Sequence, residues 1–399
     1  MFIMVMPMKI LLIHDAPLDE WKGTQKAVAE YGNYLFSMGF DVVYLNNKAF
    51  RRNTTERKLP ENRQVSFRIK DGNFKKILGV WVIKKKTIKT INPDVIYVST
   101  FNSFFYMPFY GYPTVMGAYV IGPEHEQVGS RLSRIAMHFK KSVFRIIVRF
   151  YEKDKVTFHT LNPSQAKWLR KIIGNNLRIV TLPPPLDCKK YQRNSSKLVE
   201  PFTVTYLGAL TKYKGFKIFS EAIHSLNASK NSDKPIRFNI IGTGELRSIA
   251  DNMVNSYENV VEFGTLGEQE NIDVLSRSHL LVSPSYVENF HYVTAEAQLC
   301  GLPVVSSDIS GPRFIIVNLS TGTLVPVGDI KAIVSAIINY RDLFYSDTEA
   351  YMDLMERCKT NGKRFCKQNI LPEFYSNLIE PAIKGVNERK KAQNSGGLR

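Results

Sequence analysis

Short apolar runs alternate with amphipathic segments along the whole chain. In the first half the runs are Ile10–Ile13, Val42–Leu45, Val95–Val98, Val115–Val120, Val156–Leu161 and Ile179–Leu182. In the second half they are Val204–Leu207, Phe238–Ile241, Val260–Phe263, Leu280–Ser283, Val304–Ser306 and Leu324–Val325. Runs that are apolar at nearly every position and rich in β-branched residues are typical of parallel strands buried on both faces. Helical spacing lies between several of them, as in Val28, Tyr31, Leu35 and Met38 after a candidate cap at Thr24. The pattern predicts an α/β protein with two doubly wound parallel sheets.

The boundary between the two halves carries its own signals. Pro183–Pro185 cannot continue a strand or a helix, and the polar segment Gln192–Lys197 resembles a linker. With 399 residues the chain is too long for one comfortable core. We expect Rossmann-like domains at 1–195 and 196–370, followed by 371–399 as a C-terminal helix crossing back to the first domain and a polar tail. Ligands of doubly wound sheets bind beyond the carboxyl ends of the strands, so the two domains are expected to face each other across the active-site cleft.

Two apolar segments and the cysteines bear on location. Met1–Ile13 contains Pro7 and Lys9 and has no cleavage pattern, so it reads as a buried first strand. Phe101–Gly122 is broken by prolines and glycines, so we expect no transmembrane helix. The four cysteines lie far apart without a Cys-x-x-Cys pair. That spacing argues against a zinc site or a disulfide framework and favours a reducing, cytoplasmic compartment.

The net charge of +18 is unevenly distributed. Residues 1–200 contain 33 Lys and Arg against 15 Asp and Glu, whereas residues 201–399 contain 21 of each. The excess therefore lies wholly in the first half. It indicates an anionic partner there, for which nucleic acid, an anionic membrane surface and a phosphorylated substrate all qualify, as does a merely soluble basic surface.

Three loops that follow strands of the second half carry candidate chemistry. Gly208–Gly215 places Lys214 beside Gly215, a combination suited to anchoring a diphosphate, although most Lys-Gly pairs are ordinary turns. Gly242 and Gly244 form a Gly-x-Gly turn between a strand and a helix, which by itself is a weak nucleotide signal.

The third loop, Ser283–Ala297, holds two glutamates separated by seven residues. Glu288 lies in the turn after a strand, and Asn289–His291 would present the first N–H groups of the next helix to a phosphate. Glu296, further along that helix, could accept both hydroxyls of a ribose. Its small and apolar neighbours make an exposed, merely helical role less favourable, because an uncompensated charge there is costly.

Together these motifs resemble glycosyltransferase family 4, the retaining nucleotide-sugar enzymes with the two-Rossmann-domain fold called GT-B. Ser283–Val305 is similar to the family's signature of two glutamates followed by Cys-Gly-x-Pro-Val-Val, and Ser306–Pro312 and Thr321–Asp329 resemble the segments that follow it. Lys22-Gly23 resembles the glycine loop of the first domain. The resemblance covers about residues 8–380.

The resemblance implies a hexosyltransferase that uses a nucleotide-diphosphate sugar. Lys214 would bind the diphosphate with Gly23, Gly215, Gly242 and Gly244 nearby. Glu296 would bind the ribose, Glu288 the transferring sugar, and Asn289 and Phe290 would give backbone N–H groups to the phosphate. No Asp-x-Asp motif occurs, so neither a metal nor another cofactor is expected.

This chain departs from the family pattern at three places. The Gly-Gly that is common in the first loop is Lys22-Gly23 here. The arginine expected five residues before Lys214 is Ala209, so Lys212 or Arg313 would substitute or donor affinity would be lower. Where relatives carry a first-domain histidine near the donor sugar, the register gives Tyr119, and His125 could take that catalytic role after a loop shift.

The segment Ser130–Lys155 combines apolar residues at helical spacing with the basic stripe Arg134, His138, Lys141, Arg145 and Arg149. Such a helix can lie on an anionic membrane or bind a lipid phosphate, and it can equally pack inward with a solvated basic face. Together with the positive charge of the first half, this segment favours a protein that binds the cytoplasmic membrane face peripherally and acts on a lipid-linked or glycan acceptor.

Two other functions remain open from sequence. A GT-B nucleotide-sugar epimerase would rearrange the donor without an acceptor. A nucleic-acid-binding protein is suggested only by charge, and no helix-turn-helix, zinc-finger or aromatic RNA-binding signature supports it. We therefore expect no nucleic-acid partner.

Overall fold

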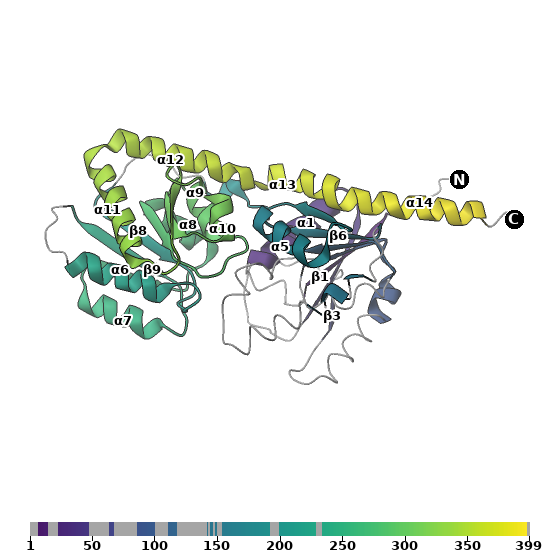
Figure 1. The fold of residues 1–399 in the computed structure, drawn as a ribbon, viewed down its shortest axis with the longest axis horizontal. Helices are drawn as coiled ribbons and strands as arrows, with labels where there is room; N and C mark the ends of the chain where they lie inside the picture. Colours follow the sequence, from purple (N-terminus) through teal and green to yellow (C-terminus); the bar gives the residue numbers. More distant parts are fainter. Residues whose placement is uncertain are drawn as a thin grey trace. The chain divides into compact units, whose positions relative to one another are not determined.

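The structure is a computed structural model of the chain (Figure 1). It describes residues 7–14, 23–47, 64–67, 86–99, 111–117, 142, 144–146, 148–149, 154–191, 199–228 and 234–396. The chain divides into two compact units, one formed by residues 1–185 with 367–399 and the other by residues 186–366. The sequence expectation placed the boundaries after 195 and after 370, whereas the structure groups 186–191 with the second unit and 367–370 with the first. The expected linker Gln192–Lys197 lies outside the described residues.

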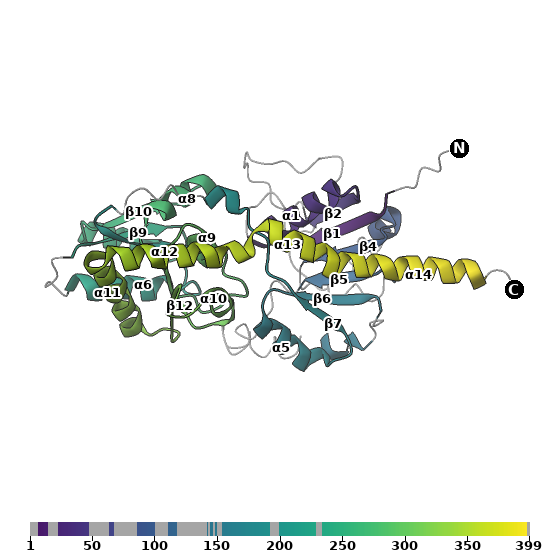
Figure 2. The ribbon, with the colours of Figure 1, turned by 90° about the horizontal axis from the view of Figure 1, so that it is seen from above.

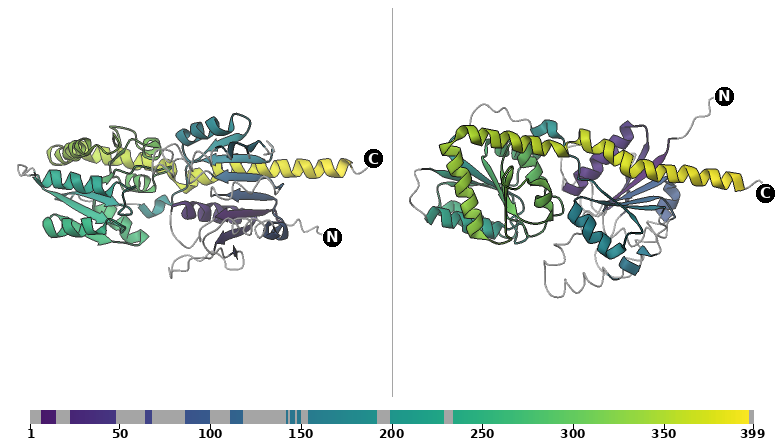
Figure 3. Two further views of the ribbon diagram at one scale, coloured as in Figure 1. Left: turned by 60° about the horizontal axis from the view of Figure 1, so that its bottom comes forward. Right: turned by 45° about the horizontal axis from the view of Figure 1, so that its top comes forward.

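The first unit is built on a seven-stranded parallel sheet with the order β3-β2-β1-β4-β5-β6-β7 (Figures 2 and 3). Its strands are β1 (Lys9–His14), β2 (Asp41–Asn47), β3 (Gln64–Phe67), β4 (Val95–Val98), β5 (Thr114–Gly117), β6 (Val156–Thr160) and β7 (Arg178–Thr181). Its helices include α1 (Gly23–Ser37), α5 (Pro163–Ile173), α13 (Lys367–Phe374), the π-helical η6 (Tyr375–Ile379) and α14 (Glu380–Gly396), and residues 86–91 are also helical. The polar end of the chain is thus helical to Gly396.

The second unit has a six-stranded parallel sheet with the order β10-β9-β8-β11-β12-β13. Its strands are β8 (Phe202–Leu207), β9 (Ile236–Ile241), β10 (Val260–Gly264), β11 (Leu280–Ser283), β12 (Val304–Ser307) and β13 (Gly322–Val325). Its helices are η4 (Cys188–Tyr191), α6 (Phe216–Ala228), α7 (Arg247–Ser256), α8 (Glu268–Arg277), α9 (Tyr292–Leu299), α10 (Ser310–Ile315), α11 (Ile330–Ser346), α12 (Thr348–Gly362) and η5 (Lys363–Phe365). Helix α6 packs against α7 and α11, and α11 also contacts β8, β12 and β13, whereas α9 contacts β11 and β12 and packs against α12 (Figure 1).

Every strand predicted from an apolar run is present, so the expectation of two doubly wound parallel sheets is confirmed. The central strands are buried along their whole length, as β4, β11 and β12 illustrate. The edge strand β3 was not predicted. Helix α1 begins at Gly23, so the candidate cap Thr24 lies inside the helix.

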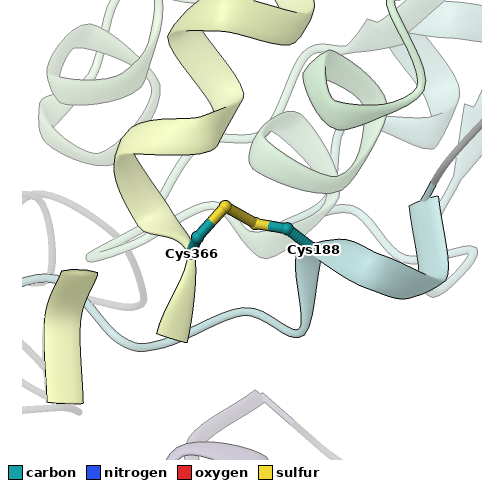
Figure 4. Close-up of a disulfide and its surroundings, with 2 residues drawn as sticks. All are labelled: Cys188 and Cys366. Atoms are coloured by element: carbon teal, nitrogen blue, oxygen red, sulfur yellow. A yellow bond between two sulfur atoms is a disulfide. The ribbon is translucent and has the colours of Figure 1, made fainter. Parts of the chain in front are cut away.

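The expectation that the cysteines form no disulfide is wrong. Cys188, at the start of η4, is bonded to Cys366, directly after η5 (Figure 4). The two positions are 178 residues apart in sequence, and the fold of the second unit brings their Cα atoms to 5.3 Å. Cysteine spacing along the chain carries no information about such a pairing.

The basic segment of the first unit is described only in part. Phe144 and Val148 are buried in the core, whereas Arg145, Ile146 and Arg149 are exposed. This alternation agrees with an amphipathic helix, whether its basic side binds a membrane or is only solvated. Within the described ranges, no helix combines the length and apolar character that crossing a bilayer requires.

Candidate active site

The candidate site forms where the strand order of the second sheet reverses. Strands β8 and β11 are neighbours, and the chain proceeds outward from them in opposite directions, to β9 and β10 on one side and to β12 and β13 on the other. At such a switch point the loops after the two central strands diverge and leave a crevice beyond their carboxyl ends. These two loops are the ones that carry Lys214 and Glu288.

The two loops are in direct backbone contact. The amide of Tyr286 donates to the carbonyl of Tyr213 at 2.9 Å. Gly215 has a φ of +70°, and a Cβ atom there would lie 2.0 Å from the carbonyl oxygen of Pro284. Only glycine satisfies both the left-handed conformation and this approach. The glycine beside Lys214 therefore has a structural reason to be there, independent of any ligand.

The approach of the loops creates an ion pair. The Lys214 Nζ atom lies 2.6 Å from the Glu288 Oε1 atom, and the exposed fractions of the two side chains are 40% and 10%. Lys214 is held by its own loop, since its amide donates to the Thr211 hydroxyl at 3.4 Å and its carbonyl accepts from the Tyr206 hydroxyl at 3.3 Å. The structure thus brings together two predicted site residues from different loops.

Glu288 is also fixed through its backbone. Its carbonyl oxygen accepts a hydrogen bond from the Gly311 amide at 3.0 Å and from the Ser310 hydroxyl at 3.2 Å. Both residues belong to α10, which follows β12. The loops after the three adjacent strands β8, β11 and β12 therefore determine where this carboxylate lies.

His291 is a buried neighbour of Glu288 that the sequence interpretation used only for its backbone. Its Nδ1 atom lies 2.6 Å from the Thr294 hydroxyl, and its Nε2 atom lies 3.0 Å from the Ser283 hydroxyl and 3.5 Å from Glu288 Oε1. Burial lowers the pKa of His291 to about 4, so the ring is neutral at pH 7. In the sequence, the only indication that His291 contacts Glu288 was their spacing of three residues.

The ionisation of Glu288 follows from these neighbours. Burial by itself raises the pKa of this carboxyl, but the charges of His291 and Lys214 and the hydrogen bond from Lys214 outweigh that effect and leave the pKa below its usual value. Because His291 is neutral at pH 7, Lys214 is the cation that keeps Glu288 ionised there. The site therefore holds a charged, fixed carboxylate with a lysine beside it.

Glu296 lies in the middle of α9 and is partly buried. Its Oε1 atom accepts a hydrogen bond from the Tyr191 hydroxyl at 3.0 Å. Tyr191 is 4% exposed and belongs to η4, 105 residues earlier in the chain. No local feature of the sequence around Tyr191 indicated this contact.

Gly242 and Gly244 have a packing role in the structure. Gly242 has a φ of +133°, and a Cβ atom there would lie 1.9 Å from the Gly208 carbonyl oxygen. A Cβ atom on Gly244 would lie 2.5 Å from the Leu210 carbonyl oxygen. The two glycines let the loop after β9 pack closely against the loop that carries Lys214.

The remaining predicted residues of this unit have varied surroundings. Asn289 and Phe290 are buried, and the Phe290 ring packs against Tyr292 and Phe365 with centroid distances of 5.1 and 5.3 Å. Of the two suggested substitutes for the missing arginine, Arg313 is bonded to Asp308 through both its Nε and a terminal nitrogen. Lys212 lies on the same loop as Lys214.

The first unit contributes less to the description of the site. Gly23 is the first residue of α1, after the switch-point strand β1. His125 and Tyr119 lie outside the described residues. In the part of the chain that the structure describes, no group of three or more His, Cys, Asp or Glu side chains is placed to hold a metal ion.

Comparison with known proteins finds a family that matches the segment containing this site. Residues 188–365 match the family described as glycosyl transferases group 1, a segment that contains Lys214, Glu288 and Glu296. The gpi3 subunit of a phosphatidylinositol N-acetylglucosaminyltransferase from Schizosaccharomyces pombe is 26% identical over 218 residues, which are 51% of this chain and 47% of that protein. A UDP-Gal:α-D-GlcNAc-diphosphoundecaprenol α-1,3-galactosyltransferase from Escherichia coli is 26% identical over 193 residues, which are 45% of this chain and 50% of that protein. The chain thus matches about half the length of these curated relatives.

Among solved structures, a sucrose-phosphate synthase from Thermosynechococcus elongatus is similar with a TM-score of 0.76 and 18% identity. The similarity covers 94% of this chain and 99% of that one. At this identity the likeness concerns the fold. It confirms the expected fold class, GT-B, with two doubly wound parallel-sheet domains.

Proposed function

We propose that this protein is a retaining glycosyltransferase that moves a hexosyl group from a nucleotide-diphosphate sugar to an acceptor. The observation that carries the proposal is the Lys214–Glu288 pair at the switch point of the second sheet, with Glu296 on the helix that follows. The match of residues 188–365 to glycosyl transferases group 1 supports it. The E. coli relative, which is named for a UDP-sugar donor, supports the nucleotide-sugar assignment.

The geometry suits a donor that presents a diphosphate, a ribose and a sugar. With 40% of its side chain exposed, Lys214 can donate a second N–H to a phosphate oxygen while it holds Glu288. The N-terminal end of α9 favours negative charge, and the His291 side chain makes no hydrogen bond that caps it. Glu296 would accept the ribose hydroxyls, and Glu288 would accept a hydroxyl of the transferring sugar.

Retention of configuration needs no separate base in this arrangement. The bond between the sugar C1 and the diphosphate oxygen breaks as the acceptor oxygen forms its bond to C1 on the same face. The proton of the acceptor hydroxyl moves to the departing diphosphate oxygen. Lys214 and the helix N–H groups stabilise the negative charge that develops on the diphosphate, which is usually the largest contribution of a protein to such a step.

Lys214 also underlies the proposal that no metal ion or other cofactor is required. A cation on the protein can stabilise the leaving diphosphate in the place of a divalent metal ion. Transfer should therefore persist in excess EDTA. Loss of activity in EDTA that is restored by Mg²⁺ or Mn²⁺ would contradict this part of the proposal.

The donor is the first unknown to resolve. A panel of UDP-, GDP-, ADP- and dTDP-sugars should contain one that raises the melting temperature, because a ligand that binds only the folded state stabilises it. Lys214→Ala should weaken the binding of both the sugar donor and its nucleoside diphosphate, since the diphosphate is common to both. If Ala209→Arg leaves affinity unchanged, Lys212 or another cation already fills that position.

A nucleotide-sugar epimerase is the alternative that shares the fold. Such an enzyme rearranges or releases the sugar without an acceptor. Product analysis with and without an acceptor separates the two, and consumption of the donor at the same rate in both conditions would favour the epimerase.

We further propose that the acceptor is lipid-linked or a cell-surface glycan precursor, and that the first unit binds the cytoplasmic membrane face peripherally. The basic balance of residues 1–200 supports this. So does a pocket of about 360 Å³ lined by Arg145, Arg149 and Lys171, where a lipid phosphate would find three cations. The names of the two relatives, which include phosphatidylinositol and diphosphoundecaprenol, also support it.

Vesicle co-sedimentation tests the membrane proposal. Binding should require anionic lipid and fall steeply with salt, since each basic residue near an anionic surface contributes about 1 kcal/mol that fades within about 8 Å. Changing Lys140, Lys141 and Arg145 together to Gln should weaken binding. The matched change of Lys217, Arg247 and Lys331 in the second unit should not. Failure to bind either anionic or neutral vesicles would remove the membrane proposal and leave the glycosyltransferase proposal intact.

A further inference from the structure

Helix η4 is a four-residue element in which three residues are each attached to a different part of the second unit. Cys188 is bonded to Cys366 after η5 (Figure 4). Lys190 forms an ion pair with Glu268, the first residue of α8. Tyr191 donates a hydrogen bond to Glu296 on α9. The helix therefore joins η5, α8 and α9, and its last residue contacts the carboxylate assigned above to the ribose.

Tyr191 can only act as the donor in its contact with Glu296. Burial, together with the negative charges of Glu296 and Glu268, raises the pKa of the Tyr191 phenol far above its usual value. The hydroxyl therefore keeps its proton at neutral pH. A buried donor of fixed position restrains the orientation of the carboxylate that is assigned above to the ribose.

The disulfide fixes the position of η4. A single 3₁₀ turn has little stability of its own, so its place depends on its attachments. Besides the covalent bond, the Leu186 amide donates to the Phe365 carbonyl at 2.8 Å, which brings the segments around the two cysteines together. Phe365 precedes Cys366 and packs against Phe290, which lies in the loop between β11 and α9. The disulfide is thus connected to the candidate site on two sides, through Tyr191 and through Phe365.

We propose that Tyr191 is a positioning residue for the nucleotide donor, acting through Glu296, and that the Cys188–Cys366 disulfide controls donor affinity by fixing the helix that carries Tyr191. This inference rests on the proposed function. Reduction by a dithiol transfers two electrons and two protons to the disulfide and leaves two thiols, while the dithiol becomes a cyclic disulfide. Helix η4 then loses its covalent attachment, and the Glu296 carboxylate is held less firmly.

The cysteine inventory makes the effect of a reductant specific. The chain has four cysteines, and the other two, Cys300 and Cys358, are buried thiols. A thiol assay on denatured protein should therefore find two thiols before treatment with dithiothreitol and four afterwards. Four thiols in protein that was purified and air-oxidised without reductant would overturn the proposal.

The affinity test uses UDP, GDP and ADP as probes in isothermal titration, because all three contain the ribose and the diphosphate. Tyr191→Phe should weaken binding of the nucleotide that binds by roughly tenfold, as expected for loss of a hydrogen bond to a charged group. Reduction of the wild-type protein should weaken it by a smaller factor, roughly three- to tenfold, and reoxidation with glutathione disulfide should restore it. The turnover number at saturating donor should change much less than the KM, which a general loss of structure would not produce.

Matched variants separate this proposal from a structural effect. Tyr257→Phe removes a hydroxyl that is hydrogen-bonded to His224 elsewhere in the unit. This variant should leave nucleotide affinity and its response to reductant unchanged. The double variant Cys188→Ser with Cys366→Ser should bind weakly and ignore dithiothreitol. In a Glu296→Gln background, Tyr191→Phe should add little further loss.

The outcomes distinguish the two levels of the proposal. If no nucleotide binds the oxidised wild-type protein, the proposed function fails and this inference fails with it. If a nucleotide binds and Glu296→Gln weakens it, but neither Tyr191→Phe nor reduction has an effect, only the inference is overturned. The reduction experiment on the wild-type chain remains decisive should the cysteine variants fail to fold.

Discussion

Each unit contains a histidine that is fully buried, and the two have different neighbours. His159 of the first unit lies between the Tyr97 hydroxyl and the Leu182 carbonyl, each at 2.8 Å, beside the aromatic rings of Tyr31 and Phe374. His291 of the second unit lies between two hydroxyls and 3.5 Å from the Glu288 carboxylate. Burial lowers the pKa of both rings to about 4.

The comparison shows that a perturbed pKa does not by itself identify a functional site. His159 has neutral partners within a packed aromatic cluster, which is the pattern of a structural residue. His291 belongs to a group that also contains a fixed carboxylate and a lysine at the edge of the sheet where ligands bind. The neighbouring charges, rather than the size of the shift, distinguish the two environments.

The largest expected effect tests the charged group. Glu288→Gln keeps the shape of the side chain and removes its charge, so transfer should fall by about 10²- to 10³-fold, the range seen when one preorganised electrostatic contact is lost. Steady-state transfer assays measure this fall, and thermal melts measure the separate loss of stability expected when the ion pair with Lys214 is broken. The control is Glu221→Gln, which removes a carboxylate from an exposed i,i+4 pair on α6. Equal rates in the wild type and in Glu288→Gln would remove Glu288 from the mechanism.

Acid should destabilise both units through their histidines. The unfolded chain binds protons at these rings near pH 6.5, whereas the folded chain binds them only near pH 4. The unfolded state therefore holds more protons in this window, and stability falls as the pH falls from 6.5 to 4, by as much as about 3 kcal/mol for each histidine. Glu288, whose pKa is lowered, adds a further loss below its unfolded value of 4.5. Urea denaturation at pH 7 and at pH 4.5 measures the difference, and equal stability at the two pH values would contradict it.

The proposed contact between Glu296 and the ribose gives the next effect. Glu296→Gln should weaken nucleotide binding by roughly 1.5–3 kcal/mol, the range for hydrogen bonds to a charged group. Titration with the 2′-deoxy form of the same nucleotide sharpens the test. The wild-type protein should prefer the ribose form, and the variant should lose most of that preference. A preference retained in full would mean that another residue binds the ribose.

The smallest effect separates the two histidines directly. His159→Phe and His291→Phe should each lower stability by about 1–3 kcal/mol, because each leaves buried hydrogen-bonding groups without their partner. Only His291→Phe should also lower the rate of transfer, since of these two histidines it is His291 that lies beside the Glu288 carboxylate. Activity per folded molecule and the melting temperature, measured on both variants, decide the matter. An equal loss of activity in both would contradict the functional distinction drawn here.

The sequence predicted every strand of the two sheets except β3, and the predicted strands include the edge strands β7, β10 and β13. Continuous apolar runs identified twelve strands, because a parallel strand buried on both faces has no polar positions to obscure it. The strand β3, with the sequence Gln-Val-Ser-Phe, lies at the edge of its sheet and alternates polar and apolar residues over only four positions. A run so short and mixed does not differ from loop sequence.

The sequence by itself determined the strand–helix alternation, the two parallel sheets and the loops in which Lys214, Glu288 and Glu296 lie, because each depends on spacing between near neighbours in the chain. Only the tertiary structure decided which of these residues touch. Lys214 meets Glu288 across 74 residues, Tyr191 meets Glu296 across 105 and Cys188 meets Cys366 across 178. These contacts follow from the order of the strands, which places β8 beside β11 and η4 beside α9. Local periodicity cannot encode that order, since it is set by how whole elements bury their apolar faces against one another.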